Sequence, residues 1–526
     1  MSDTDSGKNY MVEISSEAHV FETGKLSARG GTEADERDME MLGRKQVLNR
    51  NFRFLSTLGF ACTLMSTWEI VLMTSSFGLV NGGLAGLVWG YLIVWMGYML
   101  VFASIAEMAS MAPTSGGQYH WISEFAPPRA QKFFSYTIGW IAVLGWQTGI
   151  TSLAFLAGTM IQGLLVLCQP TYVFANWHGT LLVIAITAFC ILFNTVLAGR
   201  LPVVEGTVLV VHIVGFFAVL LPLWVLAPRT SPADVFGAFT NLGGWSSTGL
   251  AVMVGLLSPV YTLIGADSTV HMAEEVRDAS RVLPRAILTA ATLNGAMGWI
   301  MLITFCFTLG DVAAIVDSPT GYPFIAAFYN ATNSFAGTAV MTSILIVNVT
   351  SACISTVATV SRQTWSFARD GGLPGSAFIA HVKPGWNIPL NAVLLTFTIT
   401  ALLSLINIGS SVAFNAIGSL AVSALLGTYL ISFSFLILRR LRGPALPASR
   451  WSLGRWGLAV NVGAVAFLAV VWVFVFFPQT ATVTPETMNW NVVMFCGTMI
   501  FAVVYYFAWG HKCYRPPVSL VKRDLD

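Results

Sequence analysis

Among the ionisable residues inside the long apolar stretches of this chain, three are the main candidates for chemistry. Glu69 lies in ACTLMSTWEIVLMTSS, and Asp267 and His271 lie in LIGADSTVHM. A charge at the centre of a lipid-spanning helix costs roughly 2.5–3.5 kcal/mol on insertion scales, so such side chains should face the protein interior. There a carboxylate can bind a cation, hold a proton or pair with a base. A buried histidine can relay protons, although a plain hydrogen-bonding role is the commoner one.

Glu69 is the strongest candidate for binding a positively charged substrate group or a coupling proton. The alternative is a purely structural hydrogen bond. Its neighbours Thr67 and Trp68 are candidate substrate-binding residues as well. Trp68 points to another face of the helix, since adjacent helical positions do not share one. Packing is therefore the favoured role of Trp68, and a cation-binding aromatic face is the second.

Residues 249–287 form a membrane-length run that contains its own breakers. Pro259 and Gly265 interrupt the apolar pattern, and Asp267 follows directly. Backbone groups freed by such a break need partners in protein or in a water-filled cavity, and a discontinuous span is a sequence pointer to a transporter binding site. Asp267 could bind substrate or a coupling proton, or it could cap the restarted helix. Tyr261, four residues before Gly265, could close the cavity as an aromatic gate.

Other polar residues in apolar runs have blander interpretations. Gln147 and Asn348 could line a cavity or join neighbouring helices by hydrogen bonds. Glu107, Glu124 and Glu205 lie near expected helix ends, so we expect them to be anchored by nearby bases. The nearest bases along the chain are Arg129, Lys132 and Arg200.

Composition excludes a soluble protein. The 526 residues are 55% hydrophobic and 10% charged, whereas soluble domains are about a quarter charged. The net charge of +2 does not suggest a nucleic-acid partner, and the seven cysteines match no zinc spacing. No G-x-S-x-G, H-E-x-x-H or Walker A motif occurs, so the sequence predicts neither an enzyme nor a cofactor nor a metal site.

Twelve apolar runs approach or exceed the roughly 20 residues that cross a membrane. They cover residues 56–79, 84–108, 134–167, 178–198, 203–227, 249–273, 286–309, 335–361, 390–407, 412–438, 456–477 and 490–510. With the N-terminus in the cytosol, 26 of the 27 Lys and Arg residues fall on the cytosolic side, and Arg229 alone does not. Orientation follows this bias, so we expect twelve spans with both termini cytosolic.

Three regions follow from this pattern. Residues 1–53 are expected to be a disordered acidic cytosolic tail, with ten acidic residues in the first forty, followed by a basic interfacial segment. The tail is a candidate platform for cytosolic regulatory partners. Residues 54–511 are the transmembrane region, and 512–526 a cytosolic tail. The sequon at Asn330 falls in an expected external loop and is a glycosylation candidate.

Three motifs resemble those of the amino acid–polyamine–organocation transporters. GADSTVHMAEEVRDASRVLPRAI resembles the family's sixth-span signature, MAPTSGGQYHWISEFAP the segment after its second span, and SRQTWSFARDGGLPG the segment after its eighth. TWE, VNGGLAGLVWGY and SGGQYHW are most similar to the fungal amino acid/choline branch, which includes GABA, choline and biotin-precursor permeases. The resemblance covers residues from about 42 to 515.

The resemblance implies an all-α membrane protein with a 5+5 inverted repeat, broken spans one and six, and two extra C-terminal helices. It also implies a central site between the two breaks, with Tyr261 as the aromatic gate. One departure is that no Gly or Pro occurs between Phe60 and Phe77, so Ser66 to Glu69 occupies the place of the first break.

Together these observations predict a secondary active permease for a small amine-bearing solute such as GABA, another amino acid or choline. Proton symport is the favoured coupling, since no ATP-binding motif is present. A polyamine or biotin-precursor permease is the alternative, and a channel or a transporter-like nutrient receptor is the rival of a different class. The plasma membrane is the favoured location, with vacuolar or other endomembranes as the alternative.

Overall fold

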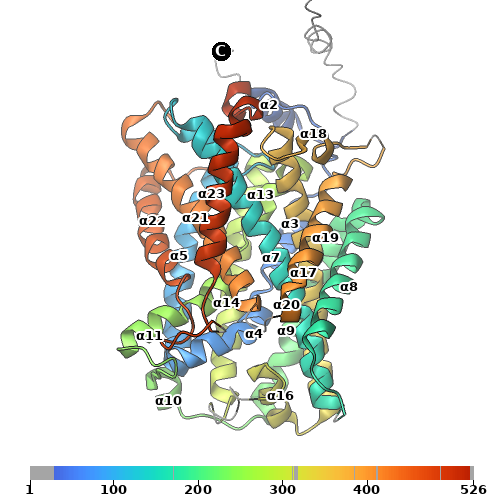
Figure 1. Cartoon of the computed structure of the whole chain (residues 1–526), viewed down its shortest axis with the longest axis vertical. Coiled ribbons are helices and arrows are strands. Elements are labelled where there is room, and N and C mark those ends of the chain that lie inside the picture. The colour runs from blue at the N-terminus through green and yellow to red at the C-terminus, as the bar shows by residue number, and fades with distance from the viewer. Residues whose placement is uncertain are drawn as a thin grey trace, which may run out of the picture.

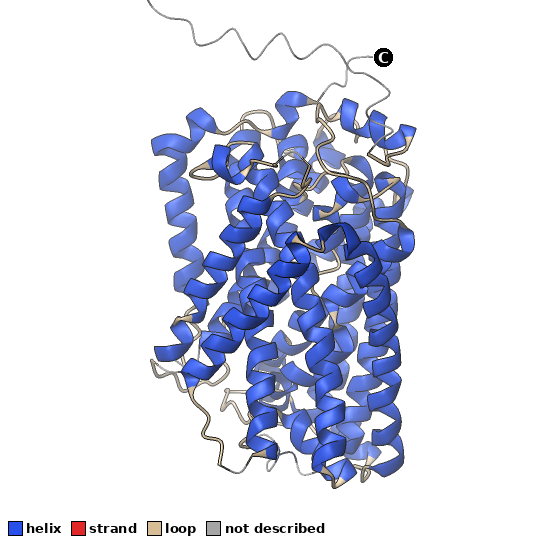
Figure 2. Cartoon of the chain, turned by 90° about the vertical axis from the view of Figure 1, so that its right-hand side faces the viewer, coloured by secondary structure: helices blue, strands red, loops and turns tan. Residues whose placement is uncertain are grey.

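The computed structural model describes residues 29–169, 171–310, 312, 315, 318–383, 385–409, 413–485 and 487–521, with the side chains of 413–415 left out. These residues fold into a bundle of helices, and the described part holds no strand beyond two isolated bridges (Figure 2). Eleven described helices are long and apolar enough to cross a membrane. The twelfth expected span, 249–273, consists of short helices. The all-α, multi-pass fold class is thus confirmed.

The first five spans fill residues 54–226, and short helices precede and interrupt them. In chain order the helices up to residue 226 are α2 (Glu33–Met41), α3 (Phe54–Met65), α4 (Thr67–Val80), α5 (Gly83–Met111), α6 (Gln118–Phe125), α7 (Gln131–Cys168), α8 (Asn176–Thr195), η1 (Ala198–Arg200) and α9 (Leu201–Leu226). The first span is α3 and α4 together.

The remaining spans follow a loop with one short helix. The helices of this region are, in chain order, α10 (Pro232–Gly237), α11 (Thr248–Gly255), α12 (Leu257–Leu263), α13 (Ser268–His271), η2 (Ala273–Glu275), α14 (Ala279–Thr308), α16 (Pro323–Thr332), α17 (Phe335–Arg369), α18 (Ser376–Ile379), α19 (Leu390–Ser404), α20 (Ile406–Gly409), α21 (Ala413–Arg442), η3 (Gly454–Trp456), α22 (Gly457–Phe474), α23 (Asn491–Tyr505), η4 (Tyr506–Gly510), α24 (His511–Cys513) and η5 (Pro517–Leu520).

The two halves repeat one plan in opposite directions. Each begins with a broken span, and each second span is followed by a short helix, α6 after α5 and α16 after α14. Arg439, at the end of α21, donates to the carbonyl of Glu124 in α6, whereas α16 lies at the opposite end of the bundle (Figure 1). The halves interlock, because α5 packs along α14 and α7 packs against both α17 and α21.

The described parts of both terminal regions lie at one end of the bundle, which we call the terminal end (Figure 1). Residues 33–41, which composition places in the disordered tail, form α2. Its Thr32 and Asp35 make a capping box, and both Asp35 oxygens accept from backbone N–H groups of Asp278 and Ala279. This tertiary anchoring stabilises a short acidic helix that would not fold alone. Residues 1–28 and 522–526 lie outside the described part of the chain.

The lipid-facing and inward faces of the spans separate cleanly on α9. Large apolar side chains such as Val203, Val210, Phe217 and Leu221 are exposed on the bundle surface. The opposite face repeats every three to four residues and is buried, as expected for one helix face. Its members are Glu205, Leu209, His212, Phe216 and Val219. The helical period therefore points two titratable side chains of α9 at the first span.

Candidate functional site

The first span is broken at Ser66, without a glycine. Ser66 adopts a left-handed conformation (φ 37°, ψ 46°) that ends α3 and starts α4. Its hydroxyl donates to the carbonyl of Thr63 at 2.7 Å. A short polar side chain is among the few that tolerate this region of backbone space. The break therefore lies at the first residue of the stretch expected to hold it.

The second break needs its glycine. After α12 ends at Leu263, Ile264 is extended and Gly265 has φ 109° before α13 begins. A Cβ on Gly265 would lie 2.8 Å from Leu64 Cδ2, so the last turn of α3 approaches the second break. The positive φ is the reason that this position favours glycine.

A cavity of about 50 Å³ lies between the breaks. Its lining residues are Leu64, Met65, Ile70, Trp146, Gly149, Leu153, Tyr261, Ile264, Gly265, Thr356, Ala421, Val422 and Leu425. The lining is apolar apart from Trp146, Tyr261 and Thr356, and it contains no charged side chain. The Tyr261 hydroxyl lies 2.7 Å from Ser152 Oγ of α7.

Two of the predicted site residues, Tyr261 and Gly265, line this cavity. Gln147 of α7 and Asn348 of α17 were also predicted but do not line it, and the residues of α7, α17 and α21 that do were not predicted. The signal for α7 was present, because Trp146, Gly149 and Leu153 recur on one helix face beside the chosen Gln147. For α21, whose lining residues are all apolar, no such signal exists.

Glu69 lies outside the cavity lining, on a face of α4 turned to α9. Its Oε1 lies 2.8 Å from His212 Nδ1. Asn294 donates through Nδ2 to the carbonyl of Cys62, so its Oδ1 must accept from His212 Nε2 at 3.2 Å. With Nε2 protonated, Glu69 and His212 share one further proton and are neutral overall, whichever of them holds it.

Residues Thr67 and Trp68 also face helices rather than the cavity. The Trp68 indole donates to the His212 carbonyl at 3.2 Å and packs edge-on against Phe216. Thr67 Cγ2 lies against Gly298 of α14, where a Cβ would be 2.7 Å away. Both side chains fix α4 to its neighbours.

Asp267 and His271, beyond the second break, are buried and hydrogen-bonded. Asp267 accepts from Gln118 Nε2 of α6 at 2.8 Å, lies beside Tyr429 of α21, and makes no side-chain cap on α13. His271 Nδ1 donates to the Ser115 carbonyl, and Nε2 accepts from the Trp146 indole, both at 3.0 Å. These partners require a neutral imidazole, because one nitrogen must donate and the other accept.

Gln147 joins helices by hydrogen bonds, whereas neither polar atom of the buried Asn348 side chain has a hydrogen-bond partner among the described residues. Gln147 Nε2 donates to Thr364 and Thr396, each at 3.2 Å, and so links α7 with α17 and α19. Asn348 is buried on α17 opposite Gly215 of α9, where a Cβ would lie 3.3 Å from its Nδ2.

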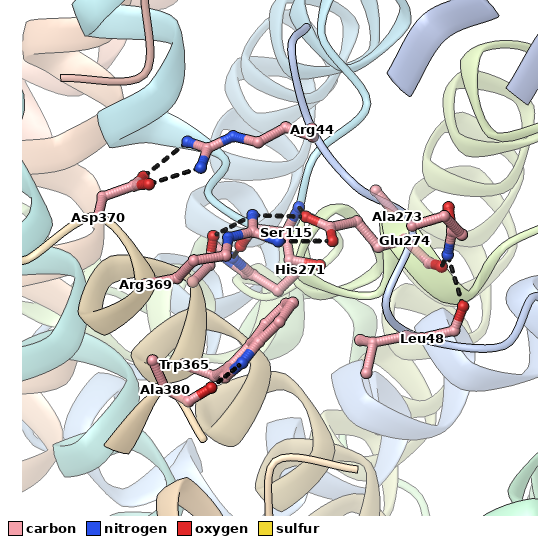
Figure 3. A network of polar contacts seen from close by, with 12 residues as sticks. Arg44, Leu48, Ser115, His271, Ala273, Glu274, Trp365, Arg369, Asp370 and Ala380 are labelled. Atoms are coloured by element: carbon pink, nitrogen blue, oxygen red, sulfur yellow. Dashed lines mark hydrogen bonds and ion pairs between the residues drawn. The ribbon is translucent and has the colours of Figure 1, made fainter. Parts of the chain in front are cut away.

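The terminal end contains a network of ion pairs around the acidic residues that come directly after the sixth span (Figure 3). Arg369 binds Glu274 through two nitrogens at 2.9 and 2.8 Å, and Arg44 binds Asp370 in the same way at 2.6 and 2.8 Å. Arg362 Nε lies 2.7 Å from Glu275. The acidic pair after the sixth span is thereby fixed to the end of α17.

Glu274 is charged within this network. Burial by itself raises the pKa of its carboxyl, but the Arg369 guanidinium, Arg44 and the Ser115 N–H hold that pKa below its usual value. The pKa of Asp35 is also lowered. Burial raises it, but Arg50 and backbone N–H groups lower it by more.

The predicted basic partners of Glu107, Glu124 and Glu205 were wrong. Glu107 pairs with Arg440 of α21, and Lys132 donates instead to the His511 carbonyl. Glu124 lies 3.1 Å from His120. Glu205 accepts from Ser355 of α17 at 2.8 Å. Of the bases close in sequence, Arg129 and Arg200 are exposed and Lys132 is half-buried on α7. Tertiary packing, not proximity in the chain, decides what a buried carboxylate meets.

Asn330 is exposed on α16, at the end of the bundle opposite the termini. In the part of the chain that the structure describes, no three His, Cys, Asp or Glu side chains come together as a metal site requires.

Comparison with known proteins agrees with this architecture. Residues 52–501 match the amino acid permease family. The chain is 31% identical over 438 residues to a Macrophomina phaseolina protein named only as a predicted amino acid/polyamine transporter, covering 82% of this chain and 96% of that protein. It is 28% identical to amino-acid permease 2 of Neurospora crassa (94% and 91% covered) and 28% identical to the choline transporter of Saccharomyces cerevisiae (88% and 82% covered). With eleven membrane-length helices and two helix breaks among its described residues, and a match over most of its length, the chain belongs to the amino acid permease family, within the amino acid–polyamine–organocation superfamily.

Proposed function

We propose that this permease takes up a small amine-bearing solute by proton symport through the cavity between the two breaks. One observation carries the proposal: Leu64 and Gly265 belong to the two discontinuous spans, and both line this cavity. Broken spans at the midplane of an inverted repeat form the binding site in this kind of transporter.

Helix ends supply the polar groups that the lining side chains lack. The first N–H groups of α4, from Thr67 to Glu69, have no partner within the helix and form its positive end. They suit a carboxylate or another anionic group. The last carbonyls of α3 and α12 are at negative helix ends and suit ammonium donors. Tyr261 and Trp146 provide aromatic faces for a methylated or aliphatic ammonium.

This arrangement favours GABA, another amino acid or choline as substrate. The similarity to a choline transporter and to amino-acid permeases supports this range. A polyamine or a biotin precursor is the alternative, and an uptake panel separates them. The panel contains radiolabelled GABA, choline, several amino acids and putrescine, each tested at two pH values.

Tyr261 serves as the gate over the substrate in this proposal. Tyr261→Ala should raise KM for the transported solute at least several-fold, because an aromatic face over an ammonium contributes about 0.5–2 kcal/mol. Tyr261→Phe keeps the ring and loses the bond to Ser152, and it should leave KM close to wild type. Equal KM values for Tyr261→Ala and Tyr261→Phe would contradict the gate.

Glu69 and Asp267 are the residues proposed from the sequence for the substrate cation or the proton, with His271 as a third proton candidate. Glu69 could act through its pair with His212, beside the positive end of α4. If Glu69→Gln retains both substrate affinity and pH-dependent uptake, neither role holds for Glu69. The same test applies to Asp267→Asn.

The terminal end is cytosolic in this proposal, since the loop-charge bias places 26 of 27 Lys and Arg residues there. The plasma membrane is the proposed location, with cytosolic partners on the N-terminal region and glycosylation of Asn330 outside. A shift in apparent mass on deglycosylation, absent in Asn330→Gln, tests the last point.

A nutrient receptor with a transporter fold is the rival of a different class. It would signal without accumulating solute, and a channel would equilibrate it. Accumulation above the external concentration excludes both.

A further inference from the structure

Glu205 differs from every other acid described in the spans by the partners of its carboxyl. It is 1% exposed. Ser355 Oγ donates to Oε1 at 2.8 Å, the Thr63 hydroxyl lies beside the carboxyl, and Oε2 accepts no bond that meets geometric limits. No base among the described residues lies within ion-pair distance of it.

The charged and titratable groups around Glu205 are engaged elsewhere or exposed. Along α9, His212 pairs with Glu69, and Arg200 is exposed at the helix start. On α17, seven residues beyond Ser355, Arg362 binds Glu275. Of the remaining groups on the elements packed against α9, Arg53 of α3 and Arg281 and Arg285 of α14 are exposed, and Arg369 of α17 binds Glu274. The others are uncharged: the buried thiols Cys62 of α3, Cys306 of α14 and Cys353 of α17, and the half-buried phenol Tyr329 of α16.

An ionised carboxylate without a cation is strongly disfavoured in an apolar interior, so such a group binds a proton or a metal ion. One carboxyl and two hydroxyls are few ligands for a metal. Calcium, for comparison, takes about six to eight oxygens. A protonated carboxyl needs only what is present, since hydroxyl groups can both donate and accept.

This site joins three elements at the edge of the central cavity. Thr63 lies in the last turn of α3, and its carbonyl accepts from the Ser66 hydroxyl at the break. Gly59 brings α3 so close to α9 that a Cβ there would lie 2.7 Å from the Glu205 carbonyl oxygen. Next to Ser355, Thr356 lines the cavity. Movement of α3 away from α9 would separate the two hydroxyls that surround the carboxyl.

We propose that Glu205 is the proton-binding residue that couples transport to the proton gradient, with Ser355 as its hydrogen-bonding partner and the Thr63 hydroxyl beside it. This rests on the proposed symport function. The protonated carboxyl stabilises α3 packed against α9 and α17. Loss of the proton leaves a buried charge, which favours movement of α3 and entry of water. Because proton binding favours one arrangement, the change between arrangements must bind or release the proton.

Proteoliposomes containing the full-length protein test this with radiolabelled GABA and choline under an imposed pH gradient. Wild type should accumulate a transported probe. Glu205→Gln, which stays neutral at every pH, should exchange internal for external probe at a rate close to wild type but lose gradient-driven accumulation completely. Glu40→Gln, the same change at an exposed site of α2, should behave as wild type.

Gradient-driven accumulation by Glu205→Gln would overturn the assignment. So would accumulation by wild type that follows a sodium gradient and not the pH gradient. Glu205→Asp, which shortens the side chain but keeps the acid, guards against misfolding: it should retain accumulation with a shifted pH profile, and an unshifted profile would contradict the proposal.

If wild type transports neither probe, GABA and choline are excluded as substrates, but the protonation state of Glu205 can still be measured. Infrared spectra of wild type at neutral pH should contain a carboxylic C=O band that Glu205→Gln removes. Absence of such a band would overturn the proposal by itself.

Discussion

The terminal end and the middle of the bundle both contain buried acids, yet they neutralise them differently. At the terminal end, Glu274, Glu275 and Asp370 each bind an arginine. In the middle, Glu69 shares a proton with His212, Asp267 accepts from an amide, and Glu205 meets hydroxyls. Arginine stays charged at any working pH, so the first group is fixed in its charge state. None of the second group binds an arginine, so these are the acids that the proposed proton symport could use.

The two regions also differ in the interactions that determine their structure. Charge pairs hold the terminal end, whereas backbone geometry at Ser66 and Gly265 shapes the middle. Single substitutions can therefore test each region on its own terms.

The largest effect should come from removing one partner of a buried ion pair. Arg369→Gln removes the ion-pair partner of the buried Glu274 and leaves it only the Ser115 N–H and the charge of Arg44, which should destabilise the protein by roughly 3–5 kcal/mol and abolish uptake. The melting temperature of the purified protein measures this. The double variant Arg369→Gln/Glu274→Gln should recover most of the loss, and a double variant as unstable as the single one would contradict the pairing.

Acidification should act with opposite sign on the wild type and on Arg369→Gln. In wild type the folded pKa of Glu274 is below that of the unfolded chain, so its stabilisation is present above about pH 4.3 and is lost as the pH falls through the lower folded value. In Arg369→Gln, the Glu274 carboxyl has lost its arginine, so protonation of this carboxyl stabilises the folded protein. The difference in melting temperature should narrow as the pH falls, and a widening difference would refute the argument.

In the middle, Gly265→Ala should cause the next largest loss. A side chain at φ 109° is strained by about 1–3 kcal/mol, and its Cβ meets Leu64. Uptake should be lost while the protein still reaches the membrane. Gly310→Ala, which also replaces a glycine with positive φ but has no atom within 4 Å of its Cβ, is the control. Equal uptake by the two variants would remove the special role of the break.

Substitutions of Ser66 should have smaller effects than that of Gly265. The effect should depend on whether the new residue fits the left-handed backbone conformation, not on its polarity. Ser66→Val places a β-branched residue in the left-handed region, at a cost of about 1–2 kcal/mol. Ser66→Gly fits that region and should change stability by less than about 1 kcal/mol. Measured uptake should rank Gly above Val, and the reverse order would show that the break is not set by this conformation.

Asp267→Asn should have the smallest effect on stability. The amide can still accept from Gln118, so the loss should be within about 1.5 kcal/mol, the range of one neutral hydrogen bond. A loss as large as that of Arg369→Gln would mean that Asp267 is a fixed charge like those at the terminal end.

Much of this architecture could be predicted from the sequence. Apolar run length and loop charge indicated the spans, and Gly265 marked the second break because φ 109° leaves few alternatives. Ser66 was harder, since its left-handed conformation is imposed by packing of α3 and α4 and has no strong local signature. Ser66 was located only through the place that the break takes in related transporters.

Partners of buried polar groups could not be predicted from the sequence. Glu205 was assigned to Arg200 by proximity in the chain, yet its carboxyl meets Ser355, 150 positions away. Glu69 has its base on α9, and the cavity wall from α21 is apolar. Such contacts depend on how distant helices pack, which periodicity alone does not reveal.

The most direct test is concentrative uptake by the purified protein in sealed liposomes. With an acidic outside, an alkaline inside and no sodium, wild type should raise the internal concentration of GABA or choline above the external one, and dissipating the pH gradient should release the excess. Equilibration without accumulation, or accumulation indifferent to the pH gradient, would contradict proton symport.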